Sequence, residues 1–284
     1  MGGDLLKITN FGTTTLLFDD GESQILFDAH FTRPSVAKFL FKKVSSDKKL
    51  INEMMQKHHI DRLKAIFVSH SHYDHVMDAP YIVKKTGATL YGSMTTKNIA
   101  LGAGVHVSKM ITFEDDHPYK IGDFKITIIP SIHSKPNVFN NDLGEEIEKP
   151  LENTHDLTLY KEGGSFDFFI EHKDQTYLIH PSCNYIKGRL KGYKVDVLYL
   201  ALAGITKMEE KNKNEFFDET IKATGAKLVI PIHWDNFFKP LDEPPKTMPK
   251  IAKRTDEVFF ELINYCEEHQ VDTIVQLPRT SIHI

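Results

Sequence analysis

The chain has 284 residues and a formal net charge of -4, with 40% hydrophobic and 26% charged residues, the composition of an ordinary globular protein. It has no long basic run, which argues against nucleic acid and anionic membranes as partners. Its 2 cysteines do not suggest a disulfide framework, and no apolar run is long enough to span a membrane.

The first part of the chain predicts short strands and then helices. Alternating or apolar runs are separated by turn residues, including Gly12 and the stretch DDGES. Farther on, Phe, Leu, Ile and Met recur at spacings of three and four residues, which indicates helix. In chain order we expect strands over 5–11, 14–20 and 23–29, helices over 34–44 and 48–59, a strand over 65–68 and a helix over 79–87.

The second part repeats this mixture of strands and helices. A polar stretch rich in Pro and Asn, 135–156, is expected to be a long surface loop, and a second Pro-rich loop is expected over 237–250. In chain order we expect strands over 89–92, 110–113 and 124–130, a hairpin over 166–180 that turns at HKDQ, a strand over 195–204, a helix over 215–225, a strand over 227–233 and a helix over 257–270. No linker or repeat is visible, so we predict one α/β domain over residues 1–284.

Histidines collect where predicted strands end. The stretch IFVSHSHYDHVMD places His70, His72, Asp74 and His75 within a span of six residues, directly after a strand expected to be buried. Other strands lead into His133, into His180 and into His233. Ligand sites in α/β proteins favour the carboxyl ends of strands, and imidazoles with a carboxylate suit zinc or a similar divalent ion.

Each histidine also has a simpler explanation. A lone His133 or His233 would more often be a hydrogen-bonded histidine of the core or rim, but the cluster at 70–75 is hard to explain as solvated surface. We expect the following histidines to be ordinary surface residues: His58, His59, His106, His117, His172, His269 and His283.

The spacing within the cluster suggests two metal positions. His70 and His72 are two residues apart on an extended segment, so their side chains project to the same side. Asp74 and His75 follow where the chain begins to turn, so they point to a second position nearby. Two metals a few ångströms apart stabilise both the attacking and the leaving oxygen of a hydrolysis.

The sequence HSHYDH resembles the HxHxDH signature of the metallo-β-lactamase superfamily, in its metal-dependent hydrolase branch. ILFDAHF is similar to the first motif, with Asp28 beneath the metal loop, and IPSIHS and IPIHWDNFF are similar to the third and last motifs. The resemblance implies a four-layer αββα sandwich of two mixed sheets with helices outside. It implies one or two divalent ions, zinc first, with Mn, Fe, Co or Ni as alternatives. The ligands it implies are His70, His72 and His133 for the first ion and Asp74, His75 and His233 for the second.

Two positions depart from the family pattern. Where relatives have an aspartate that bridges the two metals, this chain has Ser182, followed by Cys183 as an alternative ligand. A neutral serine should weaken the second metal position. Thr13 stands where relatives often have histidine.

The expected function is a metal-dependent hydrolase of an ester, a lactone or a phosphodiester. A metal-bound hydroxide would attack, and Asp74 would orient that water or accept its proton. The chain has neither a GxSxG elbow nor a P-loop. The alternatives are a non-catalytic or degenerate metal-binding member and an iron redox protein on the same fold.

The expected partner is a small-molecule substrate, with no nucleic acid and no membrane, and the oligomeric state is open. Substrate choice is expected at Arg33, Tyr73, Asn184 and Tyr185, although an arginine after a strand is more often part of a structural ion pair. The start MGGDLLKITNFG lacks a secretory signal, so we expect a cytoplasmic protein; a signal removed earlier is left open.

Overall fold

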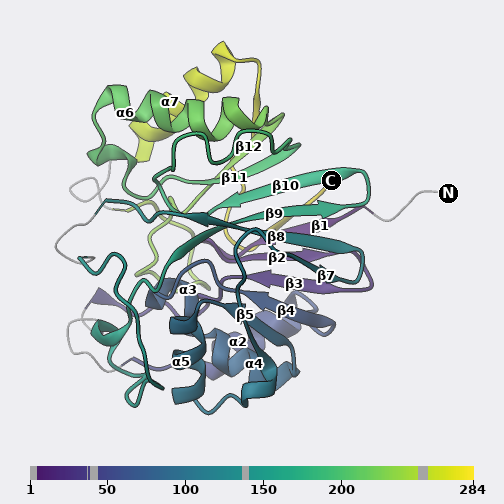
Figure 1. Ribbon diagram of the computed structural model, residues 1–284, viewed down its shortest axis with the longest axis vertical. Helices are drawn as coiled ribbons and strands as arrows, with labels where there is room; N and C mark the ends of the chain where they lie inside the picture. Colours follow the sequence, from purple (N-terminus) through teal and green to yellow (C-terminus); the bar gives the residue numbers. More distant parts are fainter. Residues whose placement is uncertain (1–4, 37, 39–43, 136–140, 249–254) are drawn as a thin grey trace.

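Two β-sheets face each other in the computed structural model, which describes residues 5–36, 38, 44–135, 141–248 and 255–284 (Figure 1). The first sheet consists of β14 (Thr280–His283), β1 (Lys7–Asn10), β2 (Leu16–Asp19), β3 (Gln24–Phe27), β4 (Leu63–Phe67), β5 (Thr89–Gly92) and β6 (Met110–Thr112), in that spatial order. The second consists of β13 (Asp272–Thr273), β12 (Leu228–Ile232), β11 (Val197–Ala201), β10 (Gln175–His180), β9 (Ser165–His172), β8 (Phe124–Ser131) and β7 (Pro118–Ile121).

Both sheets are mixed, and each has a parallel half. In the first, β3, β4, β5 and β6 are parallel, and in the second, β10, β11, β12 and β13 are parallel. The remaining strands pair antiparallel, including β1 with β14. The helices are α2 (Lys48–Lys57), α3 (Tyr73–Val76), α4 (Ala79–Thr86), α5 (Met94–Gly102), α6 (Glu210–Phe217), which continues as a π-helical turn (Asp218–Lys222), and α7 (Thr255–Glu268). Within the described residues, short 3₁₀ turns span Val107–Lys109, Leu157–Leu159 and Ile205–Lys207.

The core between the sheets is made of aromatic rings. Phe18 of β2 meets Tyr177 of β10 at 5.5 Å between ring centroids, and Phe27 of β3 meets Phe168 of β9 at 5.2 Å. All four residues are fully buried, and each such ring removes 150–250 Å² of largely apolar surface from water. This aromatic layer holds the two sheets face to face.

Helices cover the outer face of each sheet. The apolar side chains of α2, α4 and α5 pack in one cluster with the first sheet, and those of α6 and α7 pack in another with the second. Figure 1 shows α6 and α7 beside β11 and β12, and α2, α4 and α5 on the opposite side of the molecule. The predicted four-layer α/β sandwich is therefore confirmed. No helix within the described residues has the length and hydrophobicity needed to cross a membrane.

Some elements differ from the prediction. The hairpin of β9 and β10 turns at HKDQ as predicted, but α5 and the strands β7, β13 and β14 were not expected. The sequence of α5 contains two threonines, which are weak helix formers, and the Ser93 hydroxyl caps it by accepting from the Thr96 amide. Part of the helix expected over 34–44 lies outside the described residues.

The surface prediction was wrong for His172. Its side chain is buried, its ring stacks on Phe124 of the neighbouring strand at 4.4 Å, and its Nε2 lies 3.4 Å from the Asp20 carboxylate. The other histidines of that set are exposed or half-buried.

Candidate metal centre

The loop that carries the histidine cluster begins where β4 ends, beside the end of β3. Asp28 follows β3 with a φ of 51°, and its carboxylate accepts hydrogen bonds from the Ser69 amide at 2.7 Å and the Ser69 hydroxyl at 2.8 Å. It also accepts from the Thr14 hydroxyl. Because Asp28 is almost fully buried, these bonds fix the first residues of the loop from below.

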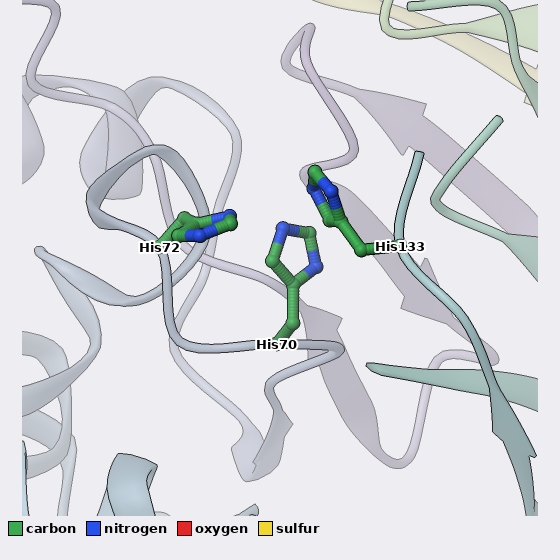
Figure 2. A group of neighbouring side chains, drawn as sticks. All are labelled: His70, His72 and His133. Atoms are coloured by element: carbon green, nitrogen blue, oxygen red, sulfur yellow. The ribbon is translucent and has the colours of Figure 1, made fainter. Parts of the chain in front are cut away.

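His70, His72 and His133 form the first group of side chains that can hold a metal. Their ligand atoms lie within 4.8 Å of one another. The ring centroids are 4.9 Å apart for His70 and His72, 4.7 Å for His70 and His133, and 4.8 Å for His72 and His133. Figure 2 shows the three rings converging, two from the β4 loop and His133 from the segment after β8. Nε2 of His70 is buried and has no hydrogen-bond partner in the described part of the chain, as expected of an atom that binds a cation.

Asp74, His75 and His233 form the second group. Oδ2 of Asp74 lies 3.7 Å from Nε2 of His75 and 3.6 Å from Nε2 of His233. The ring centroids of His70 and His75 are 3.7 Å apart, so the two groups are adjacent. The structure thus brings together the six residues that the sequence analysis names as ligands, in the two sets it names.

Three of the nitrogens that face away from the two groups are held by acceptors. Nδ1 of His75 donates to Asp28 at 2.8 Å, Nε2 of His72 to Asp142 at 3.1 Å, and Nδ1 of His133 to the Ser134 carbonyl at 3.0 Å. Metal-binding histidines usually make such a bond with their second nitrogen, which fixes the ring orientation. The donor set and its outer contacts therefore fit divalent metal.

The sequence analysis missed Asp142, which lies in the loop predicted over 135–156. Glu162 secures this segment: its side chain accepts from the Gly144 amide at 2.6 Å, and its own amide donates to Asp142 at 3.1 Å. The Glu162 carbonyl also accepts from the Ser71 amide at 2.7 Å, which ties the segment to the metal loop. Nothing in the local pattern around Asp142 distinguishes it from other acidic residues of a polar loop.

Burial and neighbouring charges set the protonation of the site. Burial, and then the neighbouring imidazoles, lower the pKa of His70 well below its ordinary value, and burial lowers the pKa of His133 to about 3. Both are therefore neutral at pH 7, the form that binds metal. For Asp74, burial alone would raise the pKa, but His75 and His233 hold it well below the ordinary value. Asp74 is therefore an ionised carboxylate.

Ser182 and Cys183 do not join either group. Oγ of Ser182 is buried and has no hydrogen-bond partner among the described residues. Cys183 is buried in the hydrophobic cluster between the second sheet and its helices. The Ser182 position therefore keeps a buried hydroxyl that no described group of the chain satisfies.

His180, which also follows a strand, supports the site from behind. Its Nδ1 lies 2.8 Å from Asp167 Oδ2 and its Nε2 lies 2.7 Å from the Asn184 carbonyl oxygen. The Asn184 side chain then donates to the His133 carbonyl at 2.8 Å. His180 and Asn184 thus fix the backbone at His133.

Arg33 forms a structural ion pair, the simpler of its two expected roles. Its guanidinium lies 2.8 Å from Asp235, and both side chains are at most 4% exposed. Asp235 also accepts from the Thr13 amide at 2.8 Å, and the Thr13 carbonyl accepts from the His233 amide at 2.7 Å. Gly12, at a φ of +85°, makes room: a Cβ there would lie 2.2 Å from the Arg33 guanidinium. The pair therefore fixes the turn that holds His233.

The chain is similar to known proteins in sequence and in fold. A UPF0173 metal-dependent hydrolase of Chloroflexus aurantiacus is 25% identical over 219 residues, 76% of each chain. One from Heliobacterium modesticaldum is 33% identical over 116 residues, 40% of this chain and 42% of that protein. Among solved structures, the metallo-beta-lactamase fold protein YhfI from Bacillus subtilis has a TM-score of 0.57 at 16% identity, over 99% of this chain and 100% of that one. CmlA, a diiron beta-hydroxylase from Streptomyces venezuelae, has a TM-score of 0.62 at 10% identity, over 100% of this chain and 55% of that one.

The family follows from sequence and fold together. The sequence model of the beta-lactamase superfamily domain matches residues 23–234, which include Asp28, the β4 loop, His133 and His233. The two facing mixed sheets are those of the metallo-β-lactamase fold. The chain belongs to the metallo-β-lactamase superfamily.

Proposed function

We propose that this protein is a metal-dependent hydrolase that cleaves an ester, lactone or phosphodiester bond in a small molecule. The observation that carries the proposal is the pair of adjacent ligand groups, with 3.7 Å between the rings of His70 and His75. The relatives named as metal-dependent hydrolases support it. Solved structures below 25% identity, including the diiron hydroxylase, support only the fold.

In this proposal, His70, His72 and His133 hold one divalent ion, and Asp74, His75 and His233 hold a second. Ions bound there would supply Lewis-acid chemistry, polarising a substrate oxygen and lowering the pKa of water. Asp74 is ionised, and its carboxylate orients the attacking water or accepts its proton. Asp28 and Asp142 keep the rings of His75 and His72 in their orientations. Zinc is the first candidate metal, and the compartment we propose is the cytoplasm.

A panel of chromogenic substrates tests the proposal. Protein purified without added metal is analysed for metal and then assayed on p-nitrophenyl esters, on bis-p-nitrophenyl phosphate and on a set of lactones. We expect turnover of at least one class, its loss after exhaustive chelation, and its return when zinc or manganese is added back. Turnover that survives chelation contradicts a metal mechanism, and bound metal without turnover on any class favours the non-catalytic alternative.

The two metal positions should be filled unequally. A carboxylate between two dications offsets part of their repulsion, and Ser182 replaces it with a neutral hydroxyl. The ion at His70, His72 and His133, held by three imidazoles, should depend less on that carboxylate. Titration of the metal-free protein by calorimetry should therefore show two separate binding steps, the weaker at Asp74, His75 and His233.

Ser182→Asp tests the cause of this difference. Its carboxylate should tighten the second step and bring the two steps closer together, whereas Ser182→Ala keeps the side chain neutral and should leave them apart. Two equally tight ions in the wild type contradict the prediction and point to another residue as the missing ligand.

A further inference from the structure

His30 is a buried imidazole beside the metal groups that the proposed chemistry does not use. It follows β3, two residues after Asp28, and its side chain is 0% exposed. Its Nδ1 lies 3.2 Å from Oγ1 of Thr13. Its Nε2 is buried and has no hydrogen-bond partner among the residues that the structure describes. A buried polar atom left without a partner is destabilising, so we expect a molecule outside the chain to bond there.

The contact with Thr13 fixes which nitrogen carries the proton. The Thr13 side chain is fully buried. Among the described contacts, Nδ1 of His30 is the acceptor available to the proton of the Thr13 hydroxyl. If the hydroxyl donates, Nδ1 accepts and the ring proton lies on Nε2. The opposite arrangement leaves both the hydroxyl proton and Nε2 unsatisfied. Burial also lowers the pKa of His30 to about 3, so the ring is neutral at pH 7. His30 thus presents an N–H donor.

The position of His30 makes it a neighbour of the second metal group, not a member. The charges of Asp74 and His75 both act on it. Its ring centroid lies 6.0 Å from Tyr73 and 6.4 Å from Phe237, whose ring is 5.6 Å from His233. His30 belongs to neither set of ligand atoms within 4.8 Å of one another. His70, whose Nε2 is also buried without a hydrogen-bond partner among the described residues, belongs to the first set.

We infer that Nε2 of His30 donates a hydrogen bond to an anionic oxygen of the substrate, at the place where the substrate meets Asp74, His75 and His233. The inference rests on the proposed function and narrows its substrate to one with an oxyanion beside the scissile bond, as in a phosphodiester. An anionic acceptor fits because it satisfies the N–H donor and a nearby cation at once. Arg33 is unavailable for this role, since its guanidinium is paired with Asp235.

A matched pair of variants separates the two ring nitrogens. His30→Asn keeps a polar atom near Nδ1 for Thr13 and removes the donor at Nε2. His30→Gln extends its amide nitrogen toward the Nε2 position and keeps the donor. Calorimetry with zinc-loaded protein and inorganic phosphate as the probe should show about tenfold weaker binding or more for His30→Asn. The phosphate affinity of His30→Gln should stay within about threefold of the wild-type affinity. Zinc content should be equal in all three proteins.

A second measurement needs no variant. In wild-type protein with ¹⁵N-labelled histidine, the His30 resonances should show a proton on Nε2 and should shift when phosphate is added to the zinc-loaded form. The inference is wrong if Nε2 carries no proton, or if the His30 resonances do not shift when phosphate is added.

The calorimetry also has outcomes that overturn it. The inference is wrong if the wild type and His30→Asn bind phosphate equally well, or if the wild type binds no phosphate. It is also wrong if His30→Asn loses zinc, because His30 would then be a metal ligand. Phosphate binding is measured without turnover. A failed substrate panel with the His30→Asn effect intact therefore contradicts the proposed hydrolysis and leaves the His30 contact standing.

Discussion

His72→Ala should strip most of the metal from the first position and abolish metal-dependent hydrolysis. The change leaves His70 and His133, and two imidazoles do not complete the shell of a divalent ion. Loss of an outer partner of a ligand typically costs 10–100-fold in metal affinity, so loss of the ligand itself should exceed roughly 100-fold. Elemental analysis of the dialysed protein and competition with a chromophoric chelator measure the change.

Two further variants calibrate this result. Asp142→Asn removes the charge that holds Nε2 of His72 and should fall within the roughly 10–100-fold range. His106→Ala removes an exposed histidine whose side chain contacts Ser108, so its metal content should equal that of the wild type. Full metal content and unchanged affinity in His72→Ala would refute the assignment of His72.

Asp167→Asn should destabilise the fold strongly, because it breaks a buried charge pair. Both ring nitrogens of His180 face acceptors, the Asp167 carboxylate and the Asn184 carbonyl, so both carry protons and the ring is a cation. Removing one partner of a buried pair typically costs about 3–5 kcal/mol. For a chain of this size the melting temperature should fall by on the order of 10 °C.

The pH dependence of stability tests whether the charge of His180 causes the loss of stability in Asp167→Asn. Burial alone would lower the pKa of His180, but the charge and hydrogen bond of Asp167 raise it above its ordinary value. The stability from this pair is therefore complete below about pH 6.5, the unfolded histidine value, and is lost as pH rises through the folded pKa. Urea unfolding at a series of pH values should show the difference between wild type and variant shrinking toward alkaline pH.

Asp20→Asn is the matched control for this pair. Asp20 lies 3.4 Å from the buried His172, whose pKa burial lowers, so that ring is neutral at pH 7. An asparagine oxygen can still accept from the Glu22 and Ser23 amides. The loss of stability should be smaller than in Asp167→Asn and should not shrink toward alkaline pH. Equal losses in the two variants would contradict a charged His180.

The parts of the site that the sequence predicts are local. The sequence HSHYDH specifies its own geometry, because an extended segment followed by the first turn of α3 directs His70 and His72 one way and Asp74 and His75 another. His133 and His233 are predictable as residues that follow strands. The order of layers is what the family resemblance implies, and the two groups of predicted strands agree with it.

The parts that the sequence does not predict come from contacts between distant segments. Asp142 reaches His72 across 70 positions, and the segment around it has no regular period. Arg33 and Asp235 are in contact only in the folded protein, where turns from the two sheets meet at Gly12. His172 was predicted to be exposed because its neighbours in the hairpin are polar. The sequence does not show that its ring stacks on Phe124 of the paired strand.

The pairing of β14 with β1 sets an order on folding. Lys7 lies opposite His283, and Leu6 and Ile284 exchange both of their backbone hydrogen bonds, so this ladder closes a loop that contains nearly the whole chain. Closing a loop over such a distance costs conformational entropy and is slow, so we expect it to follow the pairing of β1 with β2, which are neighbours in sequence. Until β14 arrives, β1 has one unpaired edge, the kind of edge that recruits strands from other molecules. Aggregation during refolding should therefore depend on how fast β14 pairs with β1.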